Sequence, residues 1–208
     1  MILRILRGRA GRGELEQLLE AVRADIADWA AIDAGLASAQ PAFRATGAGI
    51  DFLLVSTWSD AEAVIARGGE VTQPRGRLGA SGKLRDGRAG HYELVMSATH
   101  PDQRRGEVIR LSSIPLIPRR SSAFYEHLRR LWDELVDGAG LVALHVGRRF
   151  EADAEQAVVV SVWADAAALE ATTSGGFVGG AEMATFYASE PTIEHFTAVD
   201  VEGAPRAE

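Results

Sequence analysis

The sequence contains no cysteine and no asparagine, and Lys83 is its one lysine. Without cysteine the chain can form no disulfide, zinc–thiolate site, iron–sulfur cluster or thiol nucleophile. Long apolar runs are also missing: none approaches the length of a membrane span, and residues 1–13 lack the apolar core of a signal peptide. These absences predict a soluble cytoplasmic protein with no membrane partner.

A basic surplus is absent as well, because 29 acidic residues outnumber 22 lysines and arginines and leave a net charge of −7. Nucleic-acid binding depends on a basic surface that releases counterions, so no nucleic-acid partner is predicted. The glycines at 138–143 have dinucleotide-loop spacing but precede an expected strand rather than a helix. Gly82-Lys83 lacks the other P-loop residues, and no zinc-helix or serine-elbow motif occurs. The sequence predicts no metal site.

The sequence does contain a repeat. Residues 35–61 align without a gap on residues 140–166, at a constant offset of 105 residues. Identical residues at this offset include the pairs Arg44/Arg149, Val55/Val160, Ser56/Ser161, Trp58/Trp163, Asp60/Asp165 and Ala63/Ala168. Shorter echoes flank the repeat, with residues 2–5 matching 108–111 and His91-Tyr92 matching His195-Phe196. The chain is therefore predicted to contain two homologous units, at 1–106 and 107–208.

Each half is predicted to read strand, helix, strand, strand, short helix, strand, because the hydrophobic period switches from two to 3.6 and back. One apolar stripe marks the first helix, and a second stripe repeats it in the other half. The stripes consist of Leu15, Leu18, Leu19, Val22, Ile26 and Trp29, and of Phe124, Leu128, Leu131 and Leu135. Later strands are expected at 50–57, 91–98, 157–162 and 192–199.

Residues 66–90 break the pattern with seven glycines, one proline and six basic residues against Glu70 and Asp86. A loop of this length inside a compact domain is typical of either a functional segment or a tolerated insertion. Its charge would suit an anionic ligand. We predict a glycine-rich loop within the first unit and leave both readings open.

Two motifs resemble the antibiotic biosynthesis monooxygenase (ABM)-like family: Trp-x-Asp-Ala at 58–61 and 163–166, and the histidine–aromatic pairs that begin the fourth strands. The resemblance covers nearly the whole chain outside residues 66–90. It implies an α+β fold of two tandem ferredoxin-like units forming an intrachain dimeric α+β barrel, with a ligand held inside. Members of this family include cofactor-free oxygenases, haem-degrading enzymes, isomerases and proteins of no known activity.

The haem-degrading branch of this family carries a tryptophan late in the short second helix and a histidine soon after it. Arg67 and Thr172 stand about where that tryptophan would fall, and no histidine is close by. The resemblance therefore does not extend to that arrangement. Haem binding through another histidine stays an alternative.

Strand alternation sorts the candidate site residues, because apolar positions such as Val142, Leu144 and Val146 should face the helices. The alternate positions should then face the barrel interior. For the second half they are His145, Arg149, Arg110, Ser112, Ser161, Trp163, His195 and Thr197. For the first half they are Arg4, Gln40, Arg44, Ser56, Trp58 and His91. The second half has one histidine more, which favours it as the reactive half.

A neutral imidazole can take a proton from an acidic phenol or enol, and an arginine can hold the resulting anion. We therefore expect His145 or His195 as the base, without preference, and Arg149 as the clamp. Trp163 would be a stacking wall, although a repeated tryptophan is also typical of a core residue. The remaining expected substrate contacts are Arg110, Ser161, Trp58, Arg44 and His91.

The leading hypothesis is a cofactor-independent monooxygenase, or a related enzyme, acting on a small aromatic or enolic molecule. One alternative is a haem protein with His145 or His195 as the axial ligand. Another is a non-catalytic protein that binds a small molecule or serves a structural role. A homodimer of the two-unit chain is a further expectation.

Overall fold

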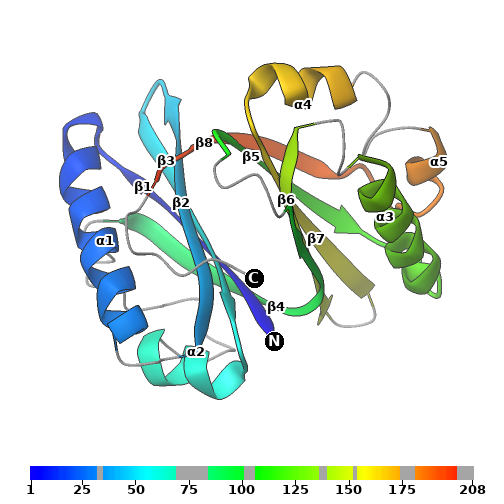
Figure 1. Cartoon of the computed structure of the whole chain (residues 1–208), viewed down its shortest axis with the longest axis horizontal. Coiled ribbons are helices and arrows are strands. Elements are labelled where there is room, and N and C mark those ends of the chain that lie inside the picture. Colours follow the sequence, from blue (N-terminus) through cyan, green and yellow to red (C-terminus); the bar gives the residue numbers. More distant parts are fainter. Residues whose placement is uncertain are drawn as a thin grey trace. The chain divides into compact units, whose positions relative to one another are not determined.

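A computed structural model describes residues 1–31, 35–68, 84–100, 106–135, 140–151, 154–173 and 181–200. The described chain is an α+β structure (Figure 1). Its first half contains β1 (Ile2–Ala10), η1 (Arg12–Glu14), α1 (Leu15–Ala31), β2 (Leu36–Thr46), β3 (Gly49–Trp58), α2 (Ala61–Gly68) and β4 (Arg85–Thr99). Its second half contains β5 (Val108–Pro115), α3 (Ser121–Leu135), β6 (Leu141–Glu151), β7 (Ala154–Trp163), α4 (Ala166–Thr173), α5 (Ala181–Ala184) and β8 (Thr192–Ala198).

The strands form one hydrogen-bonded series. Neighbours follow the order β1-β3-β2-β8-β5-β7-β6-β4, and β4 also pairs with β1, so the series closes into a barrel. The pairs β1–β3, β2–β3, β5–β7 and β6–β7 are all antiparallel. The predicted α+β barrel is confirmed.

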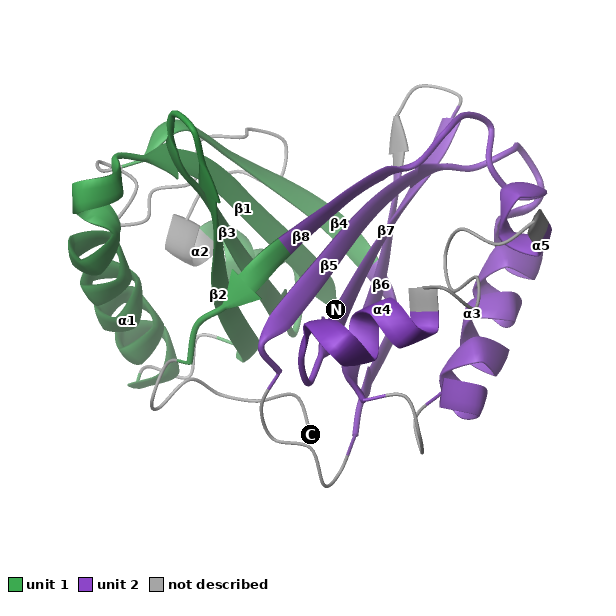
Figure 2. Ribbon diagram, turned by 90° about the horizontal axis from the view of Figure 1, so that it is seen from above, with its two compact units in different colours: residues 1–93, 196–208 green, residues 94–195 purple. Residues whose placement is uncertain are grey.

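The chain divides into two compact units, coloured separately in Figure 2. Unit 1 comprises Met1–Glu93 and Phe196–Glu208, and unit 2 comprises Leu94–His195. Strands β4 and β8 each contribute residues to both units. These units therefore differ from the predicted division at 106/107, which lies in the connection between β4 and β5.

In unit 1 the helix α1 lies against one face of the sheet (Figure 2). Its apolar stripe is buried as predicted, with Leu18 and Val22 fully buried. Each such side chain contributes roughly 1.5–3 kcal/mol by leaving water. The strand side chains in the same cluster include Leu6, Ala10, Ala39, Phe52, Leu54 and Trp58. We call the sheet side that carries them the helix face of unit 1.

Unit 2 is built in the same way around α3, whose Phe124 and Leu128 are fully buried. Ser121 is the first residue of this helix. The strand side chains in this cluster include Val108, Ile114, Leu141, Leu144, Val146, Ala157, Val159 and Trp163. They define the helix face of unit 2. In each unit we call the other sheet side the opposite face.

A glycine turn precedes the second strand of both halves. Gly35 has φ 74° and Gly140 has φ 68°, a left-handed conformation that glycine adopts without steric cost. Their carbonyl oxygens accept hydrogen bonds of 2.8 Å from the backbone N–H groups of Ser59 and Ala164. The sequence repeat thus reproduces a specific backbone turn.

The predicted loop at 66–90 is wrong at its described ends. Helix α2 continues to Gly68, and β4 begins at Arg85 instead of residue 91. Arg88 to Gly90 pair with β1, opposite Arg7 to Ile5. Cross-strand pairing here overrides the low strand propensity of glycine and aspartate. Residues 69–83 of the predicted loop lie outside the described residues.

No helix within the described ranges is long and apolar enough to cross a membrane.

Candidate functional site

His145 lies on the opposite face of unit 2, as strand alternation predicts. In the β6–β7 register it stands across from Val160, which in turn stands across from Leu111 of β5. Directly paired residues share a face, so these three side chains form one row. Leu144 and Val146 on either side of His145 belong to the helix core. The imidazole is thus the polar member of an apolar row.

Burial fixes the charge state of this imidazole. His145 is 7% exposed, and its Nδ1 is 2.9 Å from the Oγ of Ser97 on β4. Desolvation lowers the pKa of His145 to about 4, because the apolar surroundings disfavour the imidazolium. The ring is therefore neutral at physiological pH. A neutral ring with one nitrogen held by a hydroxyl can offer its other nitrogen as a base or a ligand.

Arg149 lies farther along β6 on the same face as His145, with Gly147 between them. Its Nε and Nη2 both donate to the Oε1 of Gln156, at 3.1 and 2.7 Å. Gln156 is its direct cross-strand partner on β7. This amide fixes the guanidinium without adding a negative charge. The predicted face of Arg149 is confirmed.

Trp163, Ser161 and Arg110 lie on the helix face of unit 2, so their predicted position beside His145 is wrong. Trp163 belongs to the core under α3 and donates from Nε1 to the Ser161 Oγ at 2.9 Å. Arg110 of β5 stands across from Ser161 in the sheet. Strand alternation failed here because β7 is apolar on both faces, so its valines did not indicate which residues face the helix. Ser112, two residues beyond Arg110 on β5, shares this face.

The buried Arg110 lies near Tyr187, and burial changes the pKa of both groups. Desolvation lowers the pKa of Arg110, opposed by the tyrosine. Burial likewise raises the pKa of Tyr187 to about 12, with Arg110 acting in the other direction. The Tyr187 hydroxyl makes no hydrogen bond to any described residue. This pair belongs to the helix layer and not to the row of His145.

In unit 1 the matching tryptophan and serine also lie on the helix face. Trp58 packs on Trp29 of α1 with ring centroids 5.4 Å apart and donates to the Ser56 Oγ at 2.9 Å. Arg4 stands across from both Ser56 and His91, so all three share the helix face with Trp58. Their predicted interior position is therefore wrong.

Arg4 is 2% exposed, yet it stays charged at neutral pH. Burial lowers its pKa to about 10, and Asp25 of α1 acts in the opposite direction. Its Nε and Nη2 atoms find no hydrogen-bond partner among the described residues. The charged Arg4 therefore lies between the sheet of unit 1 and α1.

Arg44 lies on the opposite face of unit 1, as predicted. Its Nη2 is 2.6 Å from an oxygen of Asp51, its cross-strand partner on β3. The guanidinium also lies over the ring of Phe196, 5.0 Å from the centroid. Gln40 shares this face and donates from Nε2 to the Val199 carbonyl at 2.8 Å.

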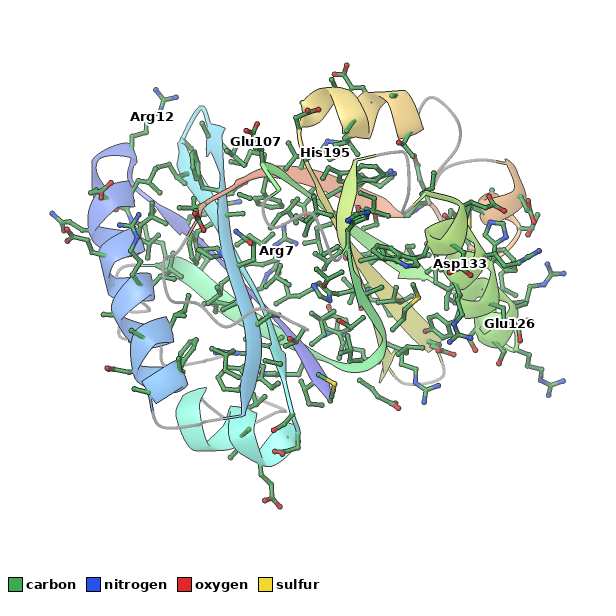
Figure 3. All side chains as sticks on the ribbon, in the orientation of Figure 1. Arg7, Arg12, Glu107, Glu126, Asp133 and His195 are labelled. Atoms are coloured by element: carbon green, nitrogen blue, oxygen red, sulfur yellow. The ribbon has the colours of Figure 1, made fainter. Side chains whose placement is uncertain are left out.

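His195, the second predicted base, is an exposed residue of β8 beside the buried Phe196 (Figure 3). Alternation places the two on different faces of the strand. Thr197 stands across from Phe43 of β2, which in turn stands across from Phe52 in the helix core, so its predicted interior position is wrong. His195 thus differs from the buried His145 in its exposure, and a catalytic role for either histidine stays a prediction.

Sequence reasoning missed Ser97 and Gln156 at these positions, and it ranked Tyr187 below the strand residues. Ser97 could have been found from its alternation with Met96, which packs against the helix core. Gln156 stands at the 105-residue offset from Asp51, an available signal. Tyr187 follows the short helix α5, and no periodicity indicated its contact with β5. Over the described residues no cluster of three or more histidine, aspartate or glutamate side chains is arranged to hold a metal ion.

No protein-family model matches the sequence, and no curated protein matches it. Solved structures do resemble it. A Fusobacterium nucleatum protein provisionally named a monooxygenase matches with a TM-score of 0.72 at 9% identity, over 98% of this chain and 95% of that one. An anthrone oxidase-like protein matches with a TM-score of 0.61 at 14% identity, over 96% and 92%.

A third structure comes from Listeria monocytogenes and is described as an uncharacterised ferredoxin-fold protein related to antibiotic biosynthesis monooxygenases. It matches with a TM-score of 0.55 at 9% identity, over 96% of this chain and 95% of that one. At such identities the likeness concerns the fold. The predicted resemblance to ABM-like proteins is confirmed at that level.

Proposed function

We propose that this chain binds a small aromatic or enolic molecule and oxidises it with dioxygen without a cofactor, with His145 as the base. The observation that carries this proposal is the buried, neutral imidazole on the opposite face of unit 2. Fold neighbours named as a monooxygenase and as anthrone oxidase-like support oxygen chemistry. The 105-residue repeat supports an origin of the chain from two tandem ferredoxin-like units.

In this scheme the Nδ1–H of His145 donates to Ser97, and the Nε2 lone pair accepts the substrate proton. With a pKa of about 4, His145 is a weak base before the substrate binds. Beside the anion that forms, the imidazolium is stabilised by a charge pair in a low-dielectric setting. Deprotonation makes the substrate electron-rich enough to reduce dioxygen. Val160 and Leu111 supply apolar walls, and Arg149 the nearby cation.

The test is oxygen consumption by the purified protein on a panel of phenols, anthrones and enolisable ketones, with anaerobic samples as blanks. On the substrate so identified, His145→Gln should lower kcat by a hundredfold or more, since general bases contribute roughly 10²–10⁴-fold. His100→Gln, which changes a histidine outside the row, is the matched control. Full activity in a folded His145→Gln protein would sink the assignment.

A haem protein is the second candidate, because a neutral imidazole whose other nitrogen is already engaged also suits an iron ligand. Bound haem would supply oxygen activation, and His145 would hold the iron. Titration with haemin separates the two candidates. A saturable one-to-one Soret band that disappears in His145→Gln favours haem, whereas an unchanged haemin spectrum removes it. An absence of both turnover and haem binding leaves the third alternative, non-catalytic small-molecule binding.

A further inference from the structure

Five arginines gather on the opposite face of unit 1, toward one end of its strands. In the sheet register Arg44 stands across from Asp51, Asp51 from Arg9, and Arg9 from Arg85. Two residues along β1, Arg7 stands across from Arg88. Figure 3 shows Arg7 on the side of the sheet away from α1. We call Arg7, Arg9, Arg85 and Arg88, with Arg44 at the edge, the arginine grid.

The grid places like charges in direct cross-strand pairs. Arg9 faces Arg85 and Arg7 faces Arg88 on adjacent antiparallel strands, an arrangement that destabilises a sheet. Asp51 contacts Arg9 at 3.6 Å and Arg44 at 2.6 Å, and Glu14 contacts Arg85 at 4.0 Å. The structure therefore concentrates positive charge locally in a chain whose net charge is −7.

The grid is compact and open to solvent. Neighbouring strands lie about 5 Å apart, and a register shift between Arg7 and Arg9 separates the two cross-strand pairs, so the four arginines stand close together on the sheet. The side chains of Arg9 and Arg85 are 70% and 74% exposed, and Arg88 is also exposed. A compact cluster of arginines suits a single small dianion, because a long polyanion needs basic residues arranged in a line. Guanidinium forks bind phosphate and carboxylate oxygens in pairs.

Arg44 gives one edge of the grid a fixed shape. Its guanidinium pairs with the Asp51 carboxylate, which offsets its charge, and lies over the ring of Phe196. The edge of the grid at Arg44 is therefore aromatic. The unit 2 counterpart of the grid lacks the charges, because the positions matching Arg7 and Arg9 at the 106-residue offset of the first strands are Ser113 and Pro115. The grid is therefore a property of unit 1 alone.

We propose that the arginine grid is a binding site for a small molecule that carries a compact dianionic group, a phosphate monoester or a vicinal dicarboxylate. Arg9, Arg85 and Arg88 bind the dianion, with Arg7 beside them, and binding relieves the like-charge pairs. The grid shares no residue with the row of His145, and the proposal does not depend on the oxidation proposed for that row.

Isothermal titration of the full chain at constant ionic strength tests the site, with phenyl phosphate, phthalate and inorganic phosphate as probes. The wild type should bind one equivalent of a dianion. The double variant Arg9→Gln/Arg88→Gln should weaken that binding tenfold or more. The control variant Arg23→Gln/Arg129→Gln removes two positive charges from helices α1 and α3 instead, so it has the same net charge as the grid variant. Its Kd for the dianion should stay within twofold of wild type. The preferred probe identifies the head group as phosphate or dicarboxylate.

Because Arg9→Gln also removes the 3.6 Å contact with Asp51, the Tm of both double variants is measured beside the titration, and a loss of binding supports the site only in a variant that is folded at the titration temperature. Equal losses in both double variants would reduce the effect to bulk charge and overturn the proposal. So would unchanged binding in the grid variant, or binding of a nucleic-acid oligonucleotide but of none of the small dianions. His145→Gln should still bind the dianion, so failure here and failure of the oxidation scheme are distinguishable.

Discussion

The two units have the same chemistry on their helix faces and different chemistry on their opposite faces. Trp58 and Trp163 each donate 2.9 Å hydrogen bonds to the serine two residues before them, and a buried arginine stands across from each serine. On the opposite faces the offset of 105 residues pairs Gln40 with His145.

A second opposite-face pair differs in charge alone. Arg44 bonds to Asp51, whereas Arg149, at the matching position, bonds to Gln156. The geometry of an arginine held by its cross-strand neighbour is repeated, but the counter-charge is not. The tryptophan, serine and buried arginine that both helix faces keep therefore serve the fold, and the positions that differ are where function is to be sought. By this criterion His145 is a stronger candidate than Trp163.

The largest expected effect tests the shared helix faces. Trp58→Ala and Trp163→Ala should each lower the free energy of unfolding by about 3–5 kcal/mol, since each removes a fully buried ring and leaves a cavity. Urea denaturation measures both. Trp132→Ala, at a half-buried and unrepeated position on α3, should cost clearly less. A Trp163→Ala protein of near-wild-type stability would break the equivalence of the two units.

The next effect belongs to unit 2 and sharpens the difference. Unfolded histidine has a pKa near 6.5 and folded His145 near 4, so between these values the unfolded chain binds more protons. The free energy of unfolding should therefore fall as the pH drops from 6.5 to about 4, by about 3 kcal/mol from this group. Denaturation curves of His145→Gln across this range should lack that component. Parallel pH profiles for the variant and wild type would contradict a buried neutral imidazole.

The smallest effect comes from exchanging the counter-groups of the paired arginines. Asp51→Gln removes the carboxylate between Arg9 and Arg44 and should cost about 1 kcal/mol, whereas Gln156→Asp gives Arg149 an ion pair worth about 0.5 kcal/mol. Both effects should shrink at high salt. Stability measurements at two salt concentrations check the signs. Equal responses in the two units would mean that the charge difference between them has no energetic consequence.

The sequence allowed the helices and the direction of β6 to be predicted, because one face of each is distinctly apolar. Leu144 and Val146 turn inward to α3, which leaves His145 and Arg149 on the other side. The direction of β7 was unpredictable in this way because Val158, Val159 and Val160 are consecutive and all buried.

Unrecognised pairing accounts for the other errors. The start of β4 reads as a turn-rich segment, and only its partners on β1 make it a strand. The buried arginines mislead similarly, since a charged residue is normally assigned to a wet surface. Arg4 and Arg110 are 2% and 4% exposed because their neighbours across the sheet and the adjacent helix layer enclose them. Such enclosure depends on contacts between distant segments.

The pairing of β2 with β8 has a consequence for the order in which the protein is made. Ala42 stands across from Ala198, and Gln40 donates to the Val199 carbonyl over a separation of 159 residues. During synthesis β2 emerges well before β8, so it waits for this neighbour until the segment between the two strands has been translated. Contacts this distant form slowly, and an unpaired strand edge is open to wrong partners in the meantime. During that interval the sheet of unit 1 lacks β8 as the neighbour of β2.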